Sequence, residues 1–104
     1  MKKIEFLKDM YNDSYYPTFL VDKLKRLLQE IVLYLEEAER TLEEVQTKLD
    51  EIILKTNDLQ EEFWDNNSEI ETVARDSIAT TVEEILDYFE IELDLEEALR
   101  ERDW

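Results

Sequence analysis

The chain contains no glycine and a single proline, and this composition constrains its fold more than any other feature. Glycine and proline are the two residues least compatible with a helix interior, whereas Leu, Glu and Lys, which are abundant here, lose little rotamer freedom in one. Apolar residues also recur at spacings of three and four, as amphipathic helices require. The sequence therefore predicts an all-α protein, an antiparallel helical bundle of four main helices plus a short C-terminal helix.

The first predicted helix places Ile4, Leu7 and Met10 on one face. Residues 12–16 have the polar and aromatic composition of a turn, which Pro17 closes. Because the first turn of a helix does not need every backbone N–H, we expect Pro17 at the first position of the second helix.

The second and third predicted helices carry apolar stripes whose phase does not break from residue 24 to residue 63. A single rod of about 45 residues is therefore an alternative to two helices. We favour a hairpin, because Thr41 and Glu44 have the spacing of a capping box and a hairpin buries both stripes at once. The stripe residues are Leu20, Leu24, Leu28, Ile31, Leu35, Ala38, Leu42, Val45, Leu49, Ile52, Thr56, Leu59 and Phe63.

A loop is predicted over residues 65–67, and Ser68 with Glu71 has the pattern of a second capping box that opens the fourth helix. Asp94 is the expected cap of the short last helix. The predicted buried face of the fourth helix comprises Ile70, Val73, Ala74, Ser77, Ile78, Val82, Ile85, Leu86 and Phe89. From the last helix we expect Leu95, Ala98, Leu99 and Trp104 to fold back onto the bundle.

The length of 104 residues indicates one domain, residues 1–104, because a second core could not be built from the remainder. With 43% apolar residues the chain lies outside the composition typical of disorder. No apolar run approaches the roughly 18 residues that a membrane span needs, and the first ten residues carry acids where a signal peptide is apolar. We therefore expect a cytoplasmic protein without a membrane partner.

Histidine, cysteine and glycine are all absent, which excludes several chemistries. Catalytic triads with histidine, thiolate nucleophiles and zinc sites with cysteine ligands are impossible within this chain. Glycine-rich phosphate loops are impossible as well, so a dehydrogenase or P-loop nucleotidase is excluded.

The charge is distributed unevenly along the chain. Residues 1–55 have a net charge of −3 and residues 56–104 a net charge of −14, which together give −17. In the first part many acids precede a base by four residues, as in ordinary surface ion pairs. Direct nucleic-acid binding is not expected, because affinity for phosphate backbones comes mainly from Lys and Arg.

The acids between residues 83 and 92 are placed unfavourably. Glu83 and Asp87 repel each other at four-residue spacing, and the later acids add negative charge near a helix C-terminus. Such placement suggests a binding surface for a basic partner, although acidic surfaces also serve solubility alone. The candidate protein-binding residues are Asp76, Glu83, Glu84, Asp87, Glu90, Glu92 and Trp104.

Two carboxylate pairs match the sequence pattern of a magnesium site. Glu36 with Glu39, and Glu62 with Asp65, match the pairs that all-helical Mg-dependent nucleotide pyrophosphatases use. With so many acids, about eight such matches are expected by chance. Magnesium is therefore required only under this alternative, and the leading interpretation needs no cofactor.

Several segments resemble one protein family. Residues 7–11, 13–17 and 19–23 (LKDMY, DSYYP and FLVDK) are similar to the opening of a family of small bacterial proteins of about 110 residues, a domain of unknown function. Residues 57–63, 68–76 and 102–104 resemble its most recognisable part. The resemblance implies a bacterial, intracellular, compact helical protein, and it implies no activity.

We therefore predict a non-enzymatic protein-binding module that docks its acidic face on a basic partner. An inhibitor, an immunity-type protein or an adaptor would act in this way, and one variant is a nucleic-acid mimic that occupies a nucleic-acid-binding enzyme. Two alternatives remain: the Mg-dependent hydrolase, and a structural homo-oligomer such as a homodimer that shares the stripe of residues 24–63.

Overall fold

The computed structural model describes residues 4–104, which contain five helices and no strand. The helices are α1 (Lys8–Tyr11), α2 (Thr18–Glu37), α3 (Leu42–Asp65), α4 (Thr72–Tyr88) and α5 (Leu95–Ala98). The predicted all-α class is confirmed, but there are three long helices where the sequence predicted four. None of the helices in this range combines the length and the apolar character that crossing a bilayer requires.

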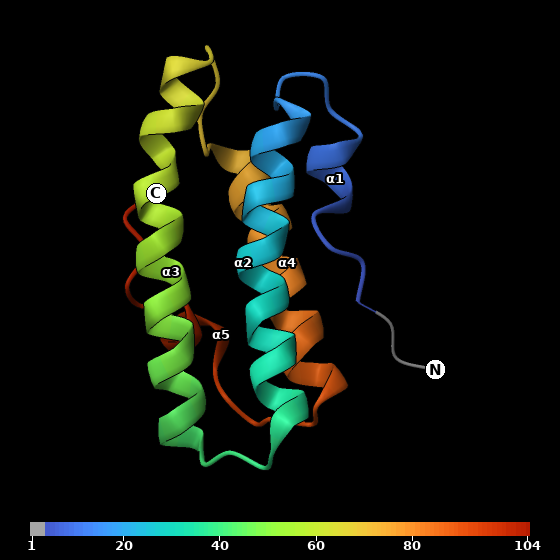
Figure 1. Cartoon of the computed structure of the whole chain (residues 1–104), viewed down its shortest axis with the longest axis vertical. Coiled ribbons are helices and arrows are strands. Elements are labelled where there is room, and N and C mark those ends of the chain that lie inside the picture. Colours follow the sequence, from blue (N-terminus) through green and yellow to red (C-terminus); the bar gives the residue numbers. More distant parts are fainter. Residues whose placement is uncertain (1–3) are drawn as a thin grey trace.

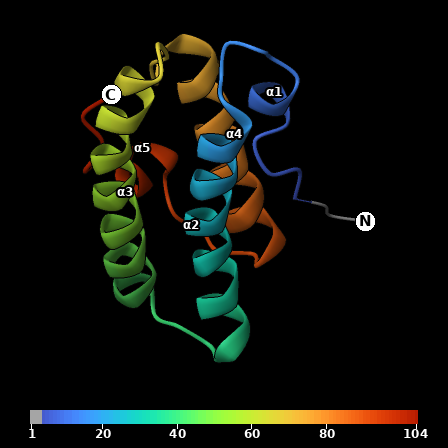
Figure 2. The same cartoon turned by 45° about the horizontal axis from the view of Figure 1, so that its top comes forward.

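The three long helices form an up-and-down arrangement (Figure 1). α2 runs down the centre and α3 returns beside it, while α4 runs down behind α2. The single turn of α1 packs against α4 and α2, and α5 contacts both α3 and α4. After α5 the chain runs back along α3 to its C-terminus, which both views show (Figures 1 and 2). The two short helices therefore each pack across two of the long helices.

The hairpin between α2 and α3 is confirmed, and so is its capping box. The Thr41 hydroxyl accepts from the Glu44 N–H at 3.1 Å, and the Glu44 carboxylate accepts from the Thr41 N–H at 2.9 Å. This backbone hydrogen bond, the largest contribution, lowers the pKa of Glu44. The four-residue turn interrupts what could otherwise have been one continuous rod.

The core comprises the predicted stripes of the long helices, with three corrections at helix ends. Ala38 and Leu42 are exposed, because Ala38 lies in the hairpin turn and Leu42 directly follows it. Val73 is also exposed, since it lies in the first turn of α4. Val21 and Ile53 are buried beside the stripes, so each apolar face is wider than the sequence pattern indicated.

The N-terminal segment is not the helix that the sequence predicted. Leu7 has a φ of 52°, in the left-handed region, so only the single turn of α1 follows it. Leu7 is fully buried, and its N–H donates to the Thr81 hydroxyl of α4 at 3.0 Å. Pro17 caps α2 from outside, because its carbonyl accepts from the Leu20 N–H at 3.0 Å while the helix begins one residue later.

The predicted capping box at Ser68 is wrong. Ser68 is buried in the loop, and its hydroxyl has no hydrogen-bond partner among residues 4–104. Its N–H donates to the Phe63 carbonyl at 2.8 Å, and Asn67 adopts a φ of 58°, so this segment terminates α3 as a Schellman motif. α4 is capped instead by Glu71, whose carboxylate accepts from the Val73 N–H at 3.5 Å.

The short last helix begins where the sequence predicted. Asp94 is its N-cap residue, although its side chain makes no capping hydrogen bond. The Asp94 carbonyl accepts from the Ala98 N–H at 2.9 Å, which holds the turn. Ala98 and Leu99 are buried, so this turn anchors the C-terminal part of the chain on the bundle.

Candidate functional site

A hollow lies at the lower end of the bundle in Figure 1, where the end of α4 approaches the turn between α2 and α3. Its volume is about 680 Å³. Four carboxylates and one base line it, and its apolar lining comes from the α2–α3 hairpin and from the residues that follow α4. The lining residues are Leu35, Glu36, Ala38, Glu39, Arg40, Leu42, Phe89, Glu90, Ile91 and Glu92.

The base in this hollow is held by the hairpin itself. The Arg40 guanidinium stacks 3.8 Å from the centre of the Tyr34 ring and donates to the Tyr34 carbonyl at 3.1 Å. It also pairs with Glu37 at 3.3 Å. Arg40 therefore braces the turn, and neither Glu36 nor Glu39 is its ion-pair partner.

The other wall depends on how α4 ends. Glu90 adopts a φ of 55° and its N–H donates to the Asp87 carbonyl at 3.1 Å. The Ile91 N–H donates to the Leu86 carbonyl at 2.8 Å, so the two bonds form a Schellman motif. This motif usually has glycine at the left-handed position, where a Cβ costs about 1–2 kcal/mol. A glutamate in that position ends the helix and directs the chain across the bottom of the bundle.

A second hollow of about 370 Å³ adjoins the first, since Ile91 lines both. Its acidic side is the outer face of α4, and its apolar side is the chain that leaves this helix. Glu84 is half-buried there, and its carboxylate accepts from the Glu5 N–H at 3.0 Å. The lining residues are Glu83, Glu84, Leu86, Asp87, Ile91, Leu93 and Leu95.

We call these two adjoining hollows the acidic groove. Five of the seven residues predicted for protein binding line it: Glu83, Glu84, Asp87, Glu90 and Glu92. Asp76 is exposed on α4 two helical turns before Glu83 and lines neither hollow. Trp104 lies at the C-terminus beside α3, far from the end of α4 (Figure 1). It is half-buried against the core.

The two carboxylate pairs proposed for magnesium lie at opposite ends of the α2–α3 hairpin. Glu36 and Glu39 flank the end of α2, and Glu39 is already outside the helix. Glu62 and Asp65 lie in the last turn of α3, where Glu62 pairs with Lys23 at 2.5 Å. The four carboxylates therefore cannot bind one ion together, and residues 4–104 contain no group of three or more side chains placed to hold a metal.

Sequence reasoning missed that Glu36 and Glu39 belong to the same groove as Glu90 and Glu92. The two pairs are more than fifty positions apart, and only the packing of α4 on α2 brings them together. The apolar residues after Tyr88 carried the available signal. Phe89 and Ile91 alternate with Glu90 and Glu92, which is the pattern of a chain with one apolar and one acidic side.

Comparison with known proteins places the chain in a family. No curated protein and no solved structure gave a significant match. A family model, described as a family of unknown function, matches residues 1–104. The match covers every segment of the molecule described above, from the N-terminal turn through the acidic groove to the last tryptophan. The chain therefore belongs to the family of unknown function DUF5713.

Proposed function

We propose that this protein is a protein-binding module whose acidic groove docks on a basic segment of a partner protein. The observation that carries the proposal is the composition of the groove. Carboxylates form its rim, and apolar side chains such as Phe89, Ile91 and Leu93 form its floor. A surface kept acidic for solubility alone does not require this apolar floor.

The groove defines the chemistry of its partner. Lysine or arginine side chains would pair with the rim, and apolar side chains between them would reach the floor, as in an amphipathic basic helix or an extended basic segment. The net charge of −17 would accelerate the encounter with such a partner and repel acidic competitors. An inhibitor, an immunity-type protein or an adaptor acts by this kind of docking.

The partner surface that fits the groove is one that normally binds an anion. A protein that binds nucleic acid carries clustered Lys and Arg for the phosphate backbone. The acidic groove would cover such a cluster. Among the forms of the proposal, a nucleic-acid mimic therefore makes the most specific prediction. In this version the nucleic acid and the protein compete for one site on the partner.

The test is an affinity capture with two matched variants. The groove variant is Glu83→Gln, Glu84→Gln, Asp87→Asn and Glu90→Gln. The control variant removes the same number of charges elsewhere, at Glu61→Gln, Asp65→Asn, Glu69→Gln and Glu101→Gln. Both variants have the same net charge, so only the position of the lost carboxylates differs. Glutamine at position 84 keeps an oxygen that can accept from the Glu5 N–H.

The expected result is one partner captured by wild type and by the control variant but not by the groove variant, and released by salt. The Debye length, beyond which interactions between exposed charges are largely screened, is about 8–10 Å at physiological salt and less than about 5 Å at 500 mM. Equal capture by the groove variant and the control variant would contradict the proposal, because total charge rather than the groove would then determine binding.

A further inference from the structure

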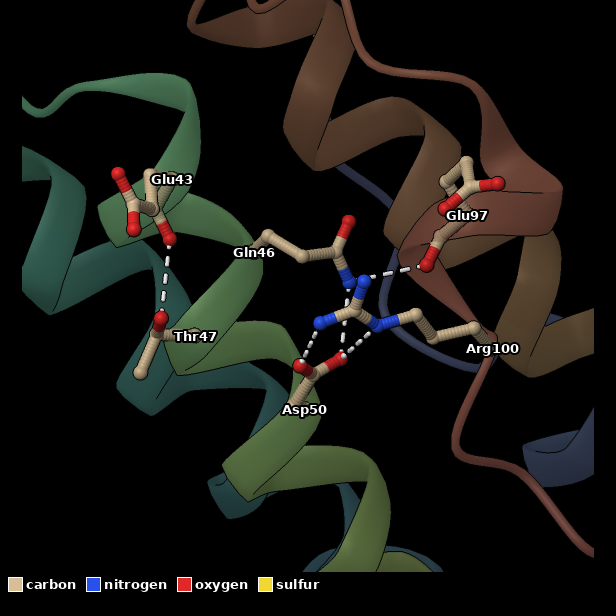
Figure 3. A network of polar contacts seen from close by, with 6 residues as sticks. All are labelled: Glu43, Gln46, Thr47, Asp50, Glu97 and Arg100. Carbon is tan, nitrogen blue, oxygen red and sulfur yellow. Dashed lines mark hydrogen bonds and ion pairs between the residues drawn. The ribbon is translucent and has the colours of Figure 1, made fainter.

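Arg100, Glu101 and Asp103 make polar contacts with one face of α3. Figure 3 shows the first of these contacts, between Arg100 and Asp50. The Arg100 guanidinium faces the Asp50 carboxylate, with Nε 3.2 Å from Oδ1 and Nη2 2.6 Å from Oδ2. The Gln46 amide donates to the same carboxylate and to the Glu97 carbonyl, both at 2.9 Å. The planar guanidinium and the carboxylate thus meet in the bidentate geometry that favours arginine over lysine.

The next contact recognises backbone rather than side chains. The Asn57 amide nitrogen donates to the Glu101 carbonyl at 2.8 Å, and its oxygen accepts from the Asp103 N–H at 3.2 Å. Gln60 then donates to the Asp103 carboxylate. Asp50, Asn57 and Gln60 are spaced seven and three residues apart, so they lie along one face of α3.

Proteins bind peptides through the same two kinds of contact: main-chain hydrogen bonds hold the segment, and side-chain contacts such as the Arg100–Asp50 pair give specificity. We propose that this face of α3 is a binding site for a short peptide of a partner, with an arginine opposite Asp50 and an acidic residue opposite Gln60, and that residues 100–104 occupy it as a tethered ligand. The inference is independent of the acidic groove, which lies on α4 and the hairpin turn.

Two observations indicate that the resident segment can be exchanged. Its contacts with α3 lie at exposed or half-buried positions, where water can replace each hydrogen bond. The indole N–H of Trp104 is buried without an acceptor among residues 4–104, so the resident segment leaves one donor unsatisfied. Ala98 and Leu99 are buried in the core, so α5 is anchored by residues that precede the exchanged segment.

The probe is the pentapeptide of residues 100–104, acetylated and labelled at its N-terminus. Fluorescence anisotropy reports its binding to the full-length chain. In wild type the tethered segment competes at an effective concentration in the millimolar range. In the Arg100→Glu chain a second carboxylate faces Asp50, so the tethered segment is displaced and the site becomes available.

We expect the pentapeptide to bind the Arg100→Glu chain at least about tenfold more tightly than wild type. Adding Asn57→Ala should weaken that binding about tenfold again, whereas Lys55→Gln, on another face of α3, should not change it. A pentapeptide with glutamate in place of its first arginine should not bind. Circular dichroism checks that each variant is helical, and Arg100→Gln replaces Arg100→Glu if the latter does not fold.

Two results would overturn the proposal. One is no binding of the pentapeptide to the folded Arg100→Glu or Arg100→Gln chain at millimolar concentration. The other is binding that neither Asn57→Ala nor the altered pentapeptide weakens, because the peptide would then be held elsewhere. Neither result depends on the acidic groove, whose residues are unchanged in all of these variants.

Discussion

The contact between Leu7 and Thr81 joins the first described residues to α4, and Thr81→Val removes it without changing side-chain shape. Valine replaces the hydroxyl with a methyl group of similar size, so the N–H of Leu7 stays buried and loses its acceptor. The Thr81 hydroxyl also donates to the Ser77 carbonyl at 2.9 Å, but this carbonyl keeps its helical partner. The lost acceptor is therefore the main effect.

A buried donor without a partner costs about 1–3 kcal/mol, so the free energy of unfolding should fall by that amount. The matched control is Thr81→Ser, which keeps the hydroxyl and loses one methyl group, worth about 0.8 kcal/mol or less. For a domain near this size, each 1 kcal/mol corresponds to about 4–8 °C in Tm. Helix propensity is similar for threonine, valine and serine and does not decide the comparison.

Urea titration followed by circular dichroism measures the free energies, and amide hydrogen exchange at Leu7 measures the local contact. Thr81→Val should be clearly less stable than Thr81→Ser, with faster exchange at Leu7. If the valine variant were as stable as the serine variant and exchange at Leu7 were unchanged, the hydrogen bond would not be what holds the N-terminal segment on α4.

Four further predictions concern single side chains. Glu90→Gly should raise the free energy of unfolding by about 0.5–1 kcal/mol in urea titration, because it removes a Cβ penalty of about 1–2 kcal/mol and adds a conformational-entropy cost of about 0.5–1 kcal/mol. Glu90→Gln should not raise it. Thr41→Ala should lower it by about 1 kcal/mol through loss of the cap. Because the pKa of Glu44 is lowered in the folded chain, its contribution to stability is complete above the ordinary value of 4.5 and is lost as pH falls through the folded pKa. Glu44→Gln should therefore reduce the loss of stability at acidic pH. An unchanged loss would exclude Glu44 as its source. Burial, followed by the hydrogen bond from the Tyr11 hydroxyl to Asp22, raises the pKa of Tyr11 from 10.0 to about 12. The contribution of Tyr11 to stability should therefore be complete below pH 10 and be lost as pH rises through about 12. Tyr11→Phe should remove that step from tyrosinate absorbance and from stability, and persistence of the step would contradict the assignment.

Periodic features could be predicted from the sequence because local physics decides them. The stripes of α2 and α3 follow from apolar spacing, and the Thr41–Glu44 capping box from a pattern four residues long. The end of α3 at Asp65 was also predictable, since the two asparagines after it tolerate turn conformations. These features do not require knowledge of distant contacts.

The features that were missed depend on packing or on unusual backbone conformations. Leu7 and Glu90 adopt left-handed conformations, and neither residue type indicates one, because the chain uses no glycine to mark such positions. The predicted capping box at Ser68 had the right residue types but lies before a loop instead of a helix. The acidic stretch of α4 was visible in the sequence, whereas its apolar floor and the contribution of Glu36 required the three-dimensional arrangement.

The most direct test of the acidic groove is the affinity of the captured partner measured between 50 and 500 mM salt for wild type and both charge variants. Wild type and the control variant should bind tightly at low salt and lose at least about tenfold in affinity across this range. The groove variant should bind weakly at every salt concentration. If wild-type affinity did not depend on salt, or if the groove and control variants bound equally well, the acidic groove would not be the binding site.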